Sequence, residues 1–162
     1  MTNPDQTNPD QTNPDQITVT RTIDAPIERV FAMLADPDQH HVFDGSRSVR
    51  ASETHTVLTE VGDVFRMKMH RDDLGDYESE NVVTSYERDV AISWAPGQVG
   101  KDPLGHSYAY RLEADGPDRT AVTLTYDWSA VTHPKIRPML PMVSREELEQ
   151  SLKLLTEALL AF

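Results

Sequence analysis

The stretch SREELEQSLKLLTEALLAF, residues 144–162, decides the fold because it is the longest regular pattern in the chain. Its apolar residues recur at spacings of four and three, which places them on one face of a helix. This stripe consists of Leu148, Leu152, Leu155, Leu159 and Phe162. Ser144 and Glu147 have the spacing of a capping box, which predicts that the helix begins at Ser144. So long an apolar face needs a partner surface.

The preceding residues supply that surface as strands, because apolar and polar residues alternate in them. The sharpest alternation places Phe65, Met67 and Met69 on one face, opposite Arg66, Lys68 and His70. Strands are predicted for residues 17–23, 48–58, 63–70, 77–86, 90–95, 106–114 and 120–129. Short turns join several of them, and the DGPD turn at 115–118 predicts a hairpin. We therefore expect one antiparallel sheet.

Two short helices are expected after the first strand. Pro26 suits the first position of a helix, where its missing N–H costs nothing. Ile27, Val30, Phe31 and Leu34 would form the buried stripe of this helix. Residues 38–43 would add a second short helix. Residues 131–143 contain three prolines, and the long helix has an alternative start as early as Pro138.

Composition excludes several classes of partner. The chain has 162 residues, a formal net charge of −12 and fifteen Lys and Arg residues that are never adjacent. It therefore lacks the basic cluster that nucleic acids or anionic membrane surfaces attract. It has no cysteine, and no apolar run reaches the roughly 18 residues that span a bilayer. We expect a cytoplasmic protein with no membrane insertion and no nucleic-acid partner, present as a monomer or homodimer.

The first 16 residues contain TNPDQ three times in tandem and no apolar residue after Met1. Such a segment cannot bury enough surface to offset the entropy of ordering. We expect a disordered leader over residues 1–16, followed by a single domain over residues 17–162.

Three segments strengthen the fold assignment. ITVTRTIDAPIERVFAMLADPDQH at 17–40 resembles the opening of polyketide cyclase/dehydrase-like proteins of the START-related superfamily. NVVTSYERDVAISWAP at 81–96 is similar to their middle strands, and HSYAYRLEADGPDRTAVTLTYDWS at 106–129 is similar to their last hairpin. The resemblance implies the α+β helix-grip fold. In it, a curved antiparallel sheet of about seven strands wraps around a long C-terminal helix, with two short helices after the first strand. It also implies an apolar cavity between the sheet and the helix.

Alternation selects the residues that face this cavity. Many of them are aromatic residues with polar tips, which need partners when they are buried. Such tips suit a small-molecule site with apolar walls and a few placed polar groups. The predicted lining is Phe65, Met67, Met69, Trp94, His106, Tyr108, Tyr110, Tyr126, Trp128, Met139, Leu148, Leu152 and Leu155. The proline-interrupted segment 139–143 is the expected entrance.

Catalysis in the cavity would need a group that moves a proton and a donor that stabilises an enolate. His106 is the candidate for the proton, and Tyr108 or Tyr110 for the donor. The alternative is that His106 is a satisfied polar residue of the interior. His40 and His41 could lie at the mouth of the cavity, but we expect both to be exposed. We also expect His70 to be solvated and His133 to lie in a loop.

No cofactor and no metal site are expected. His70, Asp72, Asp73 and Asp76 lie close together in the sequence but match neither a zinc nor an EF-hand spacing.

Three functions remain open. The first is binding of a small apolar or aromatic ligand, polyketide-like or lipid-like. The second is an aromatase/cyclase or dehydratase that acts on a polyketide-like substrate. The third is a protein-interaction module without a small ligand.

Overall fold

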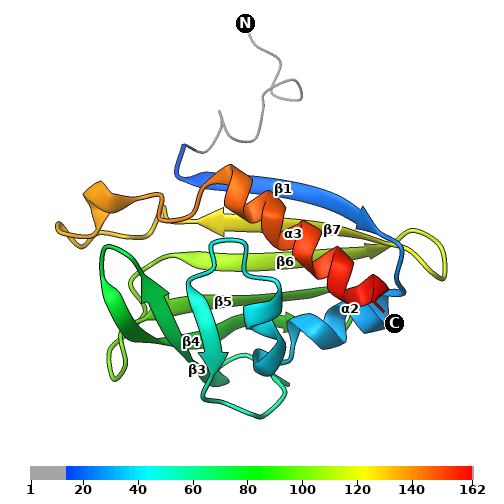
Figure 1. Ribbon diagram of the computed structural model, residues 1–162, viewed down its shortest axis with the longest axis horizontal. Helices are drawn as coiled ribbons and strands as arrows, with labels where there is room; N and C mark the ends of the chain where they lie inside the picture. The colour runs from blue at the N-terminus through cyan, green and yellow to red at the C-terminus, as the bar shows by residue number, and fades with distance from the viewer. Residues whose placement is uncertain (1–13, 162) are drawn as a thin grey trace, which may run out of the picture.

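The computed structural model describes residues 14–161 and has the predicted helix-grip architecture (Figure 1). Its seven strands form one antiparallel sheet in the order β1-β7-β6-β5-β4-β3-β2, and helix α3 lies across one face. The elements are β1 (Gln16–Ile23), α2 (Ile27–Leu34), η2 (Pro37–Val42), β2 (Val49–Ser52), β3 (Val64–Arg71), β4 (Gly75–Glu87), β5 (Ala91–Gly97), β6 (Ser107–Ala114), β7 (Thr120–Asp127), η3 (Arg137–Met139) and α3 (Arg145–Leu160).

The leader predicted over residues 1–16 lies almost entirely outside the described residues, as does Phe162 at the end of the leucine stripe. Gln16, which was placed in the leader, is instead the first residue of β1 and pairs with Asp127. None of the helices among residues 14–161 is long and apolar enough to cross a membrane.

Helix α3 begins where the capping box predicts. Ser144 Oγ accepts a hydrogen bond from the Glu147 N–H at 3.1 Å, and the Ser144 N–H donates to Glu147 Oε1 at 3.0 Å. The alternative start at Pro138 is wrong. Arg137–Met139 forms a separate 3₁₀ turn, and Leu140 after it is extended. Four leucines of the stripe are buried, namely Leu148, Leu152, Leu155 and Leu159.

The two short elements after β1 differ slightly from their predicted bounds. Helix α2 begins at Ile27, while Pro26 is its N-cap with extended backbone. The Pro26 carbonyl accepts the Val30 N–H at 3.2 Å. The predicted second helix is the 3₁₀ helix η2, capped by Asp36, whose carboxylate accepts the Asp38 N–H. Arg29 on α2 donates to the Leu159 carbonyl at 2.8 Å, which ties α2 to the C-terminal end of α3.

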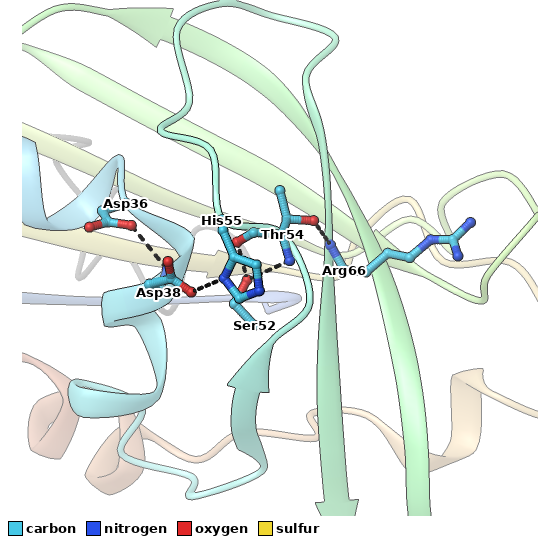
Figure 2. A network of polar contacts seen from close by, with 6 residues as sticks. All are labelled: Asp36, Asp38, Ser52, Thr54, His55 and Arg66. Carbon is cyan, nitrogen blue, oxygen red and sulfur yellow. Dashed lines mark hydrogen bonds and ion pairs between the residues drawn. The ribbon is translucent and has the colours of Figure 1, made fainter.

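Strand β2 covers only four residues, so the strand predicted over residues 48–58 is too long. Figure 2 shows the cause. Ser52 Oγ accepts the Thr54 N–H and donates to the Thr54 carbonyl. The backbone groups of Thr54 are therefore bonded to a side chain and not to a neighbouring strand. The Thr54 hydroxyl then accepts the Arg66 N–H of β3 at 3.0 Å. His55 beyond it contacts Asp38 of η2 at 2.8 Å.

The loop after η2 touches the backbone of α3. The Gly45 N–H donates to Ser151 Oγ at 2.8 Å, and Ser151 Oγ donates in turn to the Glu147 carbonyl at 3.2 Å. A Cβ atom at position 45 would collide with the Glu147 carbonyl oxygen and lie 2.7 Å from the Ser151 nitrogen. Glycine is therefore required here by the closeness of the helix backbone.

Gly45→Ala is expected to lower the free energy of unfolding by about 3 kcal/mol, because helix backbone cannot move aside as a side chain can. Urea denaturation measures this change. The matched control is Gly116→Ala in the β6–β7 turn, where an added Cβ meets nothing within 4 Å. That control should cost only about 1 kcal/mol, for its positive φ. A Gly45→Ala cost no larger than that of the control would contradict the close contact.

Candidate functional site

A cavity of about 280 Å³ lies between the inner face of the sheet and the first half of α3. This volume is at the small end of the range of roughly 300–1,000 Å³ that holds drug-sized ligands. Strands β3 to β7, helix η2 with the loop after it, and the segment before α3 all contribute to its walls.

Most of the predicted lining residues meet at this cavity. Those that line it are Phe65, Met67, Met69, Trp94, His106, Tyr108, Tyr110, Tyr126 and Leu148. Four others do not. Leu152 and Leu155 are buried farther along α3, where the helix packs in the core. Trp128 is buried outside the cavity, and the Met139 side chain is 42% exposed. In the segment 139–143, expected to form the entrance, Met142 and Val143 line the cavity.

His40 is a lining residue that the sequence analysis missed. Its ring stacks on Trp94 at a centroid distance of 4.7 Å and meets Phe65 edge-on at 5.2 Å. The expectation that His40 and His41 are both exposed is wrong for His40, which is 5% exposed, and correct for His41. A 3₁₀ helix has three residues per turn, so His40 lies on the same side as Phe43, which is also buried. This explains why His40 is buried although His41 is exposed.

Burial keeps the His40 ring neutral. Desolvation lowers its pKa to about 4, although a hydrogen bond to the Leu34 carbonyl acts in the opposite direction and raises the pKa. His40 Nε2 lies 2.8 Å from that carbonyl oxygen, which can only accept, so Nε2 carries the proton. Nδ1 is then the ring atom with a free lone pair.

A second aromatic group stands on β6 and β7. Tyr108 stacks on Tyr126 at 4.8 Å, and His106 Nδ1 lies 3.3 Å from the Tyr126 hydroxyl. The polar contact of His106 is therefore with Tyr126, to which the sequence analysis gave no catalytic role. Burial lowers the pKa of His106 and raises that of Tyr126 to about 12. Burial also raises the pKa of Tyr108 well above its usual value. All three side chains are neutral at pH 7.

Several polar tips on the cavity wall have no protein partner. Trp94 and Tyr110 are 8% and 5% exposed, and they make no side-chain hydrogen bond to any residue in the range 14–161. Within that range, no polar side-chain atom is both sealed from solvent and unpaired. The indole N–H and the phenol hydroxyl are therefore not sealed from solvent, and both residues line the cavity.

The polar cluster considered for metal binding lies on the outer face of β3. His70 Nδ1 contacts Asp76 at 2.7 Å and its Nε2 contacts Asp72 at 3.3 Å. The hydrogen bond with Asp76 raises the pKa of His70. Among residues 14–161 there is no group of three or more His, Asp or Glu side chains placed to hold a metal ion.

The buried His40 ring predicts a pH-dependent stability. Its pKa is lower in the folded protein than in the unfolded chain, so the unfolded chain binds the extra proton first. We expect the His40 contribution to stability to be constant above pH 6.5 and to fall by on the order of 3 kcal/mol as pH drops toward 4. Chemical denaturation across this range measures the slope. His40→Gln should flatten the slope, whereas the exposed neighbour variant His41→Gln should keep it. Equal slopes in the two variants would refute this role of His40.

Solved structures with the same fold are numerous. The chain superposes on protein Ms6760 from Mycobacterium smegmatis with a TM-score of 0.67 at 20% identity, covering 91% of this chain and 92% of that one. It superposes on the Aha1 dimer from Colwellia psychrerythraea with a TM-score of 0.58 at 17% identity, covering 89% and 95%. These likenesses establish the fold.

A closer relative in sequence is the uncharacterized protein Rv0088 of Mycobacterium tuberculosis. It is 32% identical over 114 residues, which are 69% of this chain and 48% of the relative. The chain thus spans about half the length of the curated relatives it matches.

The family itself follows from a match over most of the domain. Residues 24–159 match the model of the family described as "Activator of Hsp90 ATPase homolog 1-like protein". A START superfamily protein from Mycobacterium smegmatis shares the fold, with a TM-score of 0.61 at 14% identity over 89% of this chain and 96% of that one, whereas the family match does not confirm the narrower likeness to polyketide cyclases. With its seven-stranded sheet gripping α3, the chain belongs to the Activator of Hsp90 ATPase homolog 1-like family.

Proposed function

We propose that the protein binds a small apolar or aromatic ligand in the cavity between its sheet and α3. One observation carries this proposal. The wall of the cavity is built from stacked aromatic rings, and the polar tips of Trp94 and Tyr110 have no partner among the described residues. A ligand that accepts from or donates to these tips gains both affinity and orientation.

The physical character of the wall supports a flat ligand. His40, Trp94 and Tyr110 form a continuous set of rings, with centroid distances of 4.7 Å and 5.6 Å between neighbours. Aromatic faces favour offset or edge-on contacts with further rings. The small volume favours a compact molecule of one or two rings over a long acyl chain. Met67 and Met69, on β3 beyond β4, also line the cavity and can adapt to its outline.

The two tryptophans of the chain offer a direct test. Trp94 lines the cavity and Trp128 does not. Titration with 2-naphthol is expected to change the tryptophan fluorescence of the wild type and of Trp128→Phe. The change should be absent from Trp94→Phe, which lacks the reporter beside the ligand. A signal that persists in Trp94→Phe and disappears in Trp128→Phe would place binding elsewhere.

A second candidate function is dehydration or cyclisation of a polyketide-like substrate. The neutral His106 ring beside the Tyr126 hydroxyl supports it, since a neutral imidazole can take a proton and a phenol can donate to an oxyanion. Tyr108, named with His106 from the sequence, would act as a second donor in this proposal.

Mass spectrometry of reactions with a poly-β-ketone mimic tests the enzymatic proposal. Catalysed dehydration removes one water from the substrate, and Tyr126→Phe and His106→Gln should each slow that loss at least about tenfold. Equal rates with and without protein would exclude it. A loss of stability of about 2–3 kcal/mol in His106→Ala, with binding unchanged, would identify His106 as a core residue.

A third candidate, a protein-interaction role, draws support from the family description and from the dimer that the Colwellia structure describes. Native mass spectrometry of protein purified from its host separates it from ligand binding. A bound small molecule adds a few hundred daltons at most, whereas a second copy doubles the mass.

A further inference from the structure

We propose that the ligand is a compact aromatic carboxylic acid whose carboxylate binds Arg71 at the mouth of the cavity. This inference rests on the proposed function and adds the chemical class of the ligand.

Arg71 ends the apolar row on the inner face of β3. Strand alternation places Phe65, Met67, Met69 and Arg71 on the same face, and all four line the cavity. Arg71 is the only Lys or Arg among the cavity-lining residues in the range 14–161. A ligand that fills the apolar row therefore meets a positive charge at one end.

The structure orients this guanidinium and leaves part of it available. Its Nε–H donates to Asp73 Oδ1 at 3.2 Å, and Nη1 donates to the Met142 carbonyl at 3.3 Å. A guanidinium has five N–H donors, so three make no hydrogen bond to residues 14–161. The side chain is 25% exposed, whereas Asp73 is 56% exposed and a weak competitor. A planar carboxylate matches the remaining edge of the fork.

The carboxylates nearest the cavity do not occupy this edge. Asp44 accepts hydrogen bonds from the Ser46 N–H and hydroxyl and from the Val49 N–H, all within its own loop and the start of β2. Glu78 is exposed on the outward face of β4, and a hydrogen bond with Glu53 raises its pKa. The Glu147 carboxylate also acts on Arg71 but is held in the capping box by the Ser144 N–H, and the charge of Asp44 acts on Tyr77. Arg71 is the cationic group of a cavity wall that also holds carboxylates.

A hydroxyl group nearby completes the acid site. Tyr77 of β4 stands opposite Met69 in the ladder and lines the cavity. The charge of Arg71 acts on both Tyr77 and Tyr126. Burial keeps Tyr77 protonated, so its hydroxyl can donate to a carboxylate, whereas the Tyr126 hydroxyl is already hydrogen-bonded to Met142 and Tyr108. Met142, whose carbonyl holds Arg71, belongs to the segment before α3, so the acid site lies where that segment borders the cavity.

The test compares 2-naphthoic acid with its methyl ester by isothermal titration calorimetry at pH 7.5, where the acid is ionised and His40 is neutral. The two probes share the aromatic body and differ in the charge. The wild type should bind the acid about tenfold or more tightly than the ester, as a charge-assisted hydrogen-bond pair requires.

Arg71→Gln should reduce acid binding to the level of the ester, and its retained ester binding shows that the variant is folded. The matched control is Lys68→Gln, which removes the same charge from the opposite face of β3 and should leave both affinities unchanged. Arg71→Lys keeps the charge without the fork and should retain part of the preference.

Two results would overturn the inference while leaving the proposed function intact. One is equal binding of acid and ester by the wild type, which needs no variant. The other is an equal loss of preference in Lys68→Gln, which would attribute the preference to overall charge. Binding of neither probe, with no fluorescence response to 2-naphthol, would overturn the proposed function together with the inference.

Discussion

The contact of Gly45 with the backbone of α3 fixes the loop after η2 against the half of the helix that borders the cavity. The Gly45 N–H, Ser151 Oγ and the Glu147 carbonyl form a short chain of hydrogen bonds that brings the loop after η2 under the first half of the helix. At the other end, Arg29 holds the Leu159 carbonyl. The second half of α3 therefore packs in the core, and the first half spans a hollow that Leu148 and Ser151 border.

Much of the fold could be predicted because its signals are local. The capping box and the leucine stripe mark α3, and alternation marks β3, without any knowledge of neighbours. The length of β2 could not be predicted in this way. Its residues are compatible with a longer strand, and the strand ends because Ser52 bonds the backbone of Thr54.

For the candidate site, too, the features set by local pattern could be predicted and those set by distant contacts could not. Alternation correctly placed Phe65 and Met67 on the cavity wall, since a strand shows only two faces. On α3, however, Leu148 and Leu152 belong to one stripe, and only the tilt of the helix over the sheet separates wall from core. His40 was missed because histidine is compatible with both surface and interior. His40 is buried because Trp94 and Phe65, which are distant from it in the sequence, pack against its ring.

The pairing of β1 with β7 has a consequence for the order of events during synthesis. Gln16 of β1 pairs with Asp127 of β7, so β1 cannot form its ladder until β7 has been synthesised. Contacts between distant parts of a chain slow folding, because a long loop must close before they form. Helix α3 follows β7 in the chain, so it is synthesised after all seven strands. The cavity can form only after Leu148 and Ser151 of α3 have been added to the chain, and until then the inner face of the sheet is open.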